Sequence, residues 1–105
     1  MNTLRLKKEA KLKVGETYSI CLRGARRYDT DEVLDILSED DPSIEKQALI
    51  ISQNHYVFVA LENADCKDNY DKSIKTYVDL RQAMKNIYSG FEPREVVTLL
   101  RFKIL

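Results

Sequence analysis

The chain has 105 residues, 44% of them apolar and 32% charged, which are the proportions of one globular domain over residues 1–105 with one core. Three Gly and two Pro without any low-complexity tract exclude a disordered chain, and two Cys are too few for a disulfide framework. Cys21 and Cys66 are expected to be free thiols in a reducing compartment, with a single disulfide between them as the alternative.

The net charge of zero conceals a segregated distribution. Residues 1–27 carry eight basic and two acidic side chains (+6), residues 28–71 carry two basic and twelve acidic (−10), and residues 72–105 carry seven basic and three acidic (+4). Separated charge produces separated surface potential, to which a charged partner responds. The distribution therefore points to a binding partner rather than to a chemical reaction.

The basic N-terminal residues are not followed by an apolar stretch, which argues against a secretory signal. No apolar run approaches the roughly 18 residues that a membrane-spanning helix needs. We therefore expect a cytoplasmic protein without a membrane partner.

The segment from Ala10 to Arg23 alternates apolar and polar residues, which predicts a strand with one buried and one basic, solvated face. Gly15 and Glu16 interrupt the alternation and predict a bulge or tight turn. The predicted buried face consists of Ala10, Leu12, Val14, Tyr18, Ile20 and Leu22.

Residues 29–41 are acidic and ambiguous. Thr30 or Asp31 could cap a short helix with an acidic first turn, and this is the interpretation that we favour. A strand from Glu32 to Leu37 is the alternative. Pro42 ends either element.

Residues 47–62 give the strongest strand signal. Two apolar runs flank Gln53 and Asn54, which predicts a two-residue hairpin in which Ile51 faces Tyr56. Because both faces of this hairpin would be apolar, they need cover on both sides. A helix could supply the second cover, or a homodimer could form through the hairpin sheet.

A helix is predicted from Asp79, with Asp79 as N-cap, Gln82 as its capping-box partner and Gly90 as the C′ residue. A last strand follows over residues 95–105 and is expected to pair with the first strand. Its predicted inward residues are Val96, Leu100, Phe102 and Ile104. The expected fold class is α+β: a small, mainly antiparallel bent sheet or partly open barrel of about five strands, with one or two short helices.

Nothing in the sequence predicts catalysis, a metal site or a cofactor. Cys21, His55 and Cys66 lack the spacing of a zinc site and are only three ligands, whereas structural zinc needs four. The acidic segment lacks the glycine and terminal glutamate of a calcium-binding loop, and no phosphate-binding glycine motif occurs. We expect a protein that is not an enzyme.

The first functional hypothesis is a protein-interaction module, with an acidic surface that binds a protein partner. An acidic surface can compete for a groove that normally holds nucleic acid, as an inhibitor or immunity-type protein does. The alternative is that the neighbouring basic segments compensate this charge internally. The residues concerned are Asp29, Asp31, Glu32, Asp35, Glu39, Asp40 and Asp41.

The second hypothesis is direct binding of RNA or single-stranded DNA by the basic face of the terminal strands. Basic side chains would meet phosphates and a tyrosine would stack on a base. A zero net charge argues against it, and a solubilising basic face is the simpler interpretation. The candidate residues are Lys11, Lys13, Arg23, Arg26, Arg27, Tyr28, Arg101 and Lys103.

Overall fold

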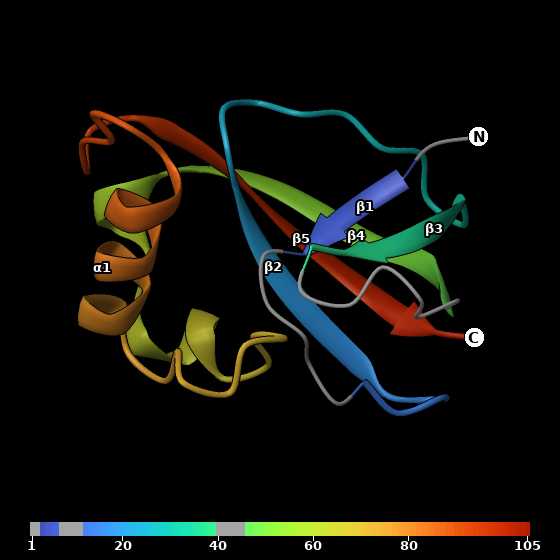
Figure 1. The fold of residues 1–105 in the computed structure, drawn as a ribbon. Helices are drawn as coiled ribbons and strands as arrows, with labels where there is room; N and C mark the ends of the chain where they lie inside the picture. Colours follow the sequence, from blue (N-terminus) through green and yellow to red (C-terminus); the bar gives the residue numbers. More distant parts are fainter. Residues whose placement is uncertain (1–2, 7–11, 40–45) are drawn as a thin grey trace.

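The structure, a computed structural model, describes residues 3–6, 12–39 and 46–105 (Figure 1). These residues form an α+β fold with one bent sheet and one α-helix, as predicted. The strands are β1 (Thr3–Leu6), β2 (Thr17–Arg23), β3 (Val33–Ser38), β4 (Lys46–Val57) and β5 (Val96–Ile104). Two 3-10 turns (Phe58–Ala60 and Asn63–Cys66) and α1 (Tyr77–Ile87) lie between β4 and β5.

The strand order is β1-β3-β4-β5-β2. Only β1 and β3 pair in parallel, so the sheet is mainly antiparallel. The sheet is not closed, but it curls so that its two edge strands, β1 and β2, lie over the same face (Figure 1). The expected pairing of the last strand with the first long strand is confirmed, with Tyr18 opposite Phe102.

The concave face of the sheet encloses the larger of two apolar clusters. Because side chains alternate across a strand, the even residues of β2 and β5 share this face. It is closed by apolar residues from both edges of the sheet and by Tyr70 from the loop before α1. Its most buried members are Leu4, Leu6, Tyr18, Leu34, Ala48, Ile50, Leu100, Phe102 and Ile104.

The second apolar cluster lies on the opposite face, where α1 and the 3-10 turns cover β2 and β5. Cys21, Val97 and Leu99 from the strands pack with Leu80 and Met84 of α1. Phe58 and Phe91 meet edge to face, with ring centroids 5.0 Å apart. The odd residues of β2 and β5 are therefore apolar only under the helix.

The predicted hairpin at Gln53 and Asn54 is wrong, because β4 runs without a turn from Lys46 to Val57. A bulge between Ile50 and Ser52, opposite Phe102 and Arg101, shifts the alternation instead. An extra residue of this kind reverses which side chains face the core. The two apolar runs thus belong to one strand, whose partners are β3 and β5.

The helix favoured for residues 29–41 is also wrong. Val33–Ser38 is the strand β3, with Leu34 and Ile36 buried. Pairing with β1 on one side and β4 on the other outweighs the helical spacing of the sequence. Asp40 and Asp41 lie outside the described residues.

Smaller corrections concern element ends. The strand predicted over residues 10–23 begins at Thr17, and residues 12–16 form a turn in which Gly15 has a left-handed φ of 87°. Ala10 and Lys11 lie outside the described residues. In the capping box of α1, Thr76 is the N-cap and Asp79 its N3 partner. Val96, predicted to face inward, is 42% exposed.

Candidate interaction surfaces

Three of the predicted acidic residues lie in a tight turn before β3. The Glu32 amide donates to the Asp29 carbonyl at 3.1 Å, and Asp31 adopts a left-handed φ of 66°, which aspartate tolerates better than most residues. Two further hydrogen bonds join this turn to β4. The Asp31 amide donates to the Ile50 carbonyl at 3.0 Å, and the Ile50 amide donates to the Glu32 carbonyl at 2.9 Å. The turn therefore holds these carboxylates beside β4.

Of the remaining acidic residues that the structure describes, one lies on β3 and one follows it. Asp35 is exposed in the middle of the strand and accepts a hydrogen bond from Gln47 at 3.2 Å. Glu39 follows the strand and lies on the rim of a cavity described below. The described carboxylates thus divide into a group at the start and middle of β3, which we call the acidic edge (Asp29, Asp31, Glu32 and Asp35), and Glu39 at its other end.

Exposed apolar side chains accompany the acidic edge on the convex face of the sheet. Val33 of β3 and Leu49 of β4 are direct cross-strand partners. Val33 is 36% exposed, Leu49 is half-buried, and Ile51 at the bulge is 41% exposed. We call these three residues the apolar patch. Sequence periodicity did not reveal it, because the predicted hairpin paired Ile51 with Tyr56.

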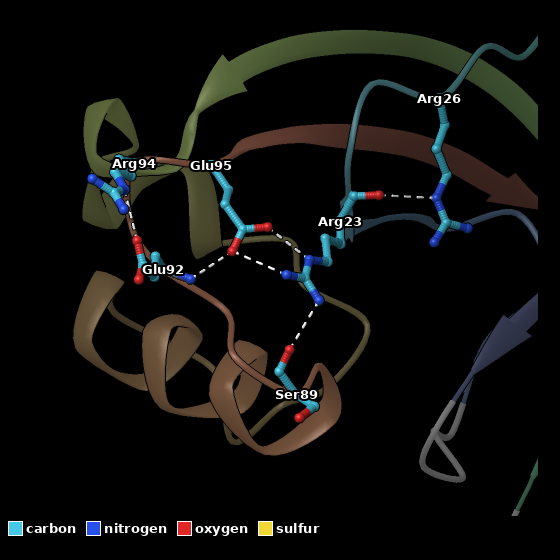
Figure 2. Close-up of polar contacts among 6 residues, drawn as sticks. All are labelled: Arg23, Arg26, Ser89, Glu92, Arg94 and Glu95. Atoms are coloured by element: carbon cyan, nitrogen blue, oxygen red, sulfur yellow. Dashed lines mark hydrogen bonds and ion pairs between the residues drawn. The ribbon is translucent and has the colours of Figure 1, made fainter.

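Two of the predicted nucleic-acid-binding arginines are engaged in ion pairs. Arg23 binds both carboxylate oxygens of Glu95, at 2.6 and 3.1 Å, and donates to the Ser89 carbonyl at 3.1 Å (Figure 2). The hydrogen bonds that the Glu95 carboxylate accepts hold its pKa below its ordinary value. The bond from the Arg23 side chain has the larger effect and the one from the Glu92 amide the smaller. Arg101 pairs with Asp68 at 3.0 Å.

The predicted basic stripe is interrupted by α1 and its neighbours. Arg23 and Arg101 lie on the same face of the sheet, but Cys21 and Leu99 between them are covered by the second apolar cluster. Lys103 is exposed opposite Leu49, and Lys13 lies in the turn before β2. Lys11 lies outside the described residues.

Arg26, Arg27 and Tyr28 belong to the loop after β2. Side chains from β4 and β5 form hydrogen bonds with the backbone of this loop. Thr98 of β5 accepts from the Arg26 amide at 2.8 Å and donates to the Gly24 carbonyl at 2.7 Å. Because the bulge shifts the alternation of β4, Gln53 also faces this loop and hydrogen-bonds both the amide and the carbonyl of Tyr28.

The only histidine of the chain belongs to the same set of contacts. His55 Nε2 lies 2.6 Å from the Arg26 carbonyl oxygen and donates to it, since a carbonyl can only accept. Arg26 itself donates through Nε to the Arg23 carbonyl at 3.2 Å (Figure 2). Arg26 and Arg27 remain exposed on a loop whose backbone is fixed.

A cavity of about 350 Å³ lies between the two sheet edges and α1. Its floor is the outer edge of β2 at Ile20, Cys21 and Leu22, and α1 forms one wall. The opposite wall consists of β1 and the loop after β2. Among the residues that the structure describes, the polar and charged side chains around it are Thr3, Arg5, Arg26, Tyr28, Glu39, Asn69, Tyr70 and Tyr88.

Of the three soft side chains considered as metal ligands, Cys21 and Cys66 share the second apolar cluster, and His55 lies apart from Cys21. Burial raises the pKa of the Cys21 thiol to about 12, so it is protonated at neutral pH. Burial also raises the pKa of Cys66, and both cysteines are free thiols. In the strand register, His55 lies opposite Thr98 and Cys21 lies opposite Leu99. Because Thr98 and Leu99 are neighbours on β5, the imidazole and this thiol lie on opposite faces of the sheet. Across residues 3–6, 12–39 and 46–105, no three His, Cys, Asp or Glu side chains form a potential metal site.

Comparison with known proteins finds no matching family model, no matching curated protein and no matching solved structure. None of the helices in the described part of the chain has the length and apolar character needed to cross a membrane.

Proposed function

We propose that this protein is a non-enzymatic protein-interaction module whose convex face at β3 and β4 binds a basic protein partner. The observation that carries the proposal is the apolar patch, which stays partly exposed directly beside the acidic edge. Protein interfaces combine an apolar centre with a polar rim in this way.

The partner's chemistry follows from the charges around the patch, where the four carboxylates of the acidic edge outnumber Lys103, which is exposed opposite Leu49. The turn at Asp29–Glu32 is joined to β4 by two backbone hydrogen bonds, which hold the backbone of these acidic residues beside the apolar patch. A surplus of carboxylates attracts lysine and arginine side chains, raises the rate of association and disfavours acidic partners. A nucleic-acid-acting protein offers such a basic surface, and occupying it would inhibit that protein.

Direct binding of RNA or single-stranded DNA is the competing function. The exposed Arg26 and Arg27 favour it, whereas the ion pairs of Arg23 and Arg101 reduce the number of cations available for phosphates. Every cation withheld from a phosphate lowers the slope of log affinity against log salt concentration by about one. We therefore expect weak oligonucleotide binding that does not involve the apolar patch.

The test compares three full-length proteins as bait: wild type, the double variant Asp31→Lys/Leu49→Lys, and Val78→Lys as the control. Val78 is 71% exposed on α1, away from the convex face at β3 and β4, so its substitution adds charge without touching the apolar patch. A partner retained by wild type and by the control is identified, purified and titrated against all three. We expect a basic protein whose affinity falls at least about tenfold in the double variant alone.

A partner bound equally by the double variant and the wild type would contradict the proposal. A labelled single-stranded oligonucleotide, titrated at low and high salt, serves as the second measurement. Tight, salt-sensitive binding that is lost in Arg26→Glu/Arg27→Glu but retained in Asp31→Lys/Leu49→Lys would establish the competing function instead.

A further inference from the structure

The outer edge of β2 presents unpaired backbone groups inside the cavity. In an antiparallel pair, alternate residues direct their N–H and C=O groups to the neighbouring strand. The hydrogen bonds of Glu16 and Gly24 to β5 show that the even residues of β2 bond to β5. The odd residues, Ser19, Cys21 and Arg23, therefore direct their backbone groups away from the sheet.

At Ser19 the chain itself extends this edge. The Ser19 amide donates to the Asp68 carbonyl at 2.7 Å, and the Tyr70 amide donates to the Ser19 carbonyl at 2.9 Å. These two bonds form a single parallel bridge between Ser19 and Asn69, after which the chain turns away. The edge of β2 is thus able to accept an added strand, and its own loop occupies only the first position.

Beyond Ser19 the edge is open. Within the described residues, the outward N–H and C=O of Cys21 and the N–H of Arg23 have no hydrogen-bond partner. A row of this kind on an edge strand is a template for pairing with another chain, which proteins either cover or use for binding. Here it forms the floor of the cavity, between α1 and β1.

The walls of the cavity define the chemistry of the added strand. On one side, α1 presents the partly exposed Ala83 and Ile87, with Leu80 and Met84 buried behind them, and this apolar wall suits alternate apolar side chains. On the other side, the described residues of the rim include Arg5, Arg26 and Glu39. Among the described residues of the rim, two guanidinium groups outnumber one carboxylate, which favours an acidic side chain in the ligand.

We propose that this cavity binds an extended peptide with alternating apolar residues and an acidic residue, which adds as a strand to the edge of β2 beyond Ser19. Its backbone pairs with Cys21 and Arg23, its apolar side chains pack against α1, and its carboxylate meets Arg26. This site is separate from the convex face at β3 and β4, so either proposal can fail without the other.

The experiment selects binders from a displayed library of random peptides on the immobilised full-length protein. The strongest binder is then synthesised with a fluorescent label and titrated by anisotropy. We expect alternating apolar residues and at least one acid in the selected sequences. Methylation of alternate backbone nitrogens of the peptide should abolish binding, because it removes the hydrogen bonds of the added strand.

Matched variants locate the site. Ala83→Arg places a long cation in the cavity, whereas Val78→Arg changes the same helix at a residue outside the cavity. We expect binding to weaken at least about tenfold in Ala83→Arg and to stay within about twofold in Val78→Arg. Arg26→Glu should weaken binding more than Arg27→Glu, because only Arg26 lines the cavity.

Amide hydrogen exchange provides a readout within the strand itself. On peptide binding, the Cys21 and Arg23 amides should become protected, while those of Ile20 and Leu22, which point to β5, should change little. Recovery of no binder, a binder unaffected by Ala83→Arg, or an unprotected Cys21 amide in the complex would each overturn the proposal.

Discussion

The convex face of the sheet is covered by α1 at one end and partly exposed to solvent at the other. Where β2 and β5 pair, α1 and the 3-10 turns cover apolar odd residues such as Cys21 and Leu99, and the second core forms. Where β3 and β4 pair, the corresponding residues Val33 and Leu49 are left partly in water beside carboxylates. The same alternation thus supports folding at one end of the sheet and presents a surface at the other.

The largest expected effect comes from breaking the covered end. Met84 is 1% exposed in α1, so Met84→Ala should lower the free energy of unfolding by about 2–5 kcal/mol through reduced burial and a residual cavity. Leu49→Ala should cost about 1 kcal/mol or less, because the side chain is only half-buried. Urea denaturation of both variants measures the difference. Equal losses would mean that the convex face at β3 and β4 is a structural core rather than a surface.

A smaller effect on stability is expected at Thr98, whose hydroxyl holds the loop after β2 against the concave face. Thr98→Val keeps the shape of the side chain but removes its hydrogen bonds to Gly24 and Arg26. Leaving these two backbone groups without their partner should lower the free energy of unfolding by about 1–3 kcal/mol and speed amide exchange at Arg26. Thr98→Ser, which retains the hydroxyl, is the control. An unchanged exchange rate at Arg26 in Thr98→Val would show that the loop is held by other contacts.

The smallest expected effect on stability concerns the ion pair of Arg23 and Glu95 at the end of β2. Because Arg23 and the Glu92 amide lower the pKa of Glu95 in the folded state, the unfolded state binds protons more readily there. This contribution is present above the ordinary glutamate pKa of about 4.3 and is lost as the pH falls through the lower folded value. Glu95→Gln should therefore reduce the acid dependence of stability below about pH 4.3.

Thermal unfolding between pH 2 and pH 7 checks this expectation, with Glu92→Gln as the control for an exposed ion pair. Glu92 binds the largely exposed Arg94, so its substitution should change stability little (Figure 2). An acid dependence identical in Glu95→Gln and wild type would show that the Arg23 pair does not contribute.

The predictions from the sequence succeeded where a pattern was local and repeated. Alternation in Tyr18, Ile20 and Leu22 identified β2, and apolar spacing identified α1, although its N-cap is Thr76 and not Asp79. They failed where a strand depended on its neighbours. The helical spacing of Val33, Leu34 and Leu37 is compatible with either element, and only the pairing of β3 with β1 and β4 decides it.

The same distinction between local patterns and long-range contacts applies to the candidate surfaces. The sequence identified the carboxylates of the acidic edge and the arginines of the loop after β2 as exposed charge. It could not identify the ion pairs of Arg23 with Glu95, 72 residues away, or of Arg101 with Asp68, because such contacts join distant segments. Nor could it place the apolar patch, which depends on the pairing of β4 with β3 and on the bulge that leaves Ile51 exposed.

The amino-acid sequence by itself determined a small α+β fold with segregated charge, because side-chain periodicity and charge are properties of neighbouring residues. The tertiary structure alone decided which charges are neutralised and which part of the β2 edge stays open. Both depend on the strand order β1-β3-β4-β5-β2, which curls the two edge strands over one face and leaves backbone groups of Cys21 and Arg23 in a cavity beside α1. Strand order is a property of long-range pairing, and no local pattern encodes it.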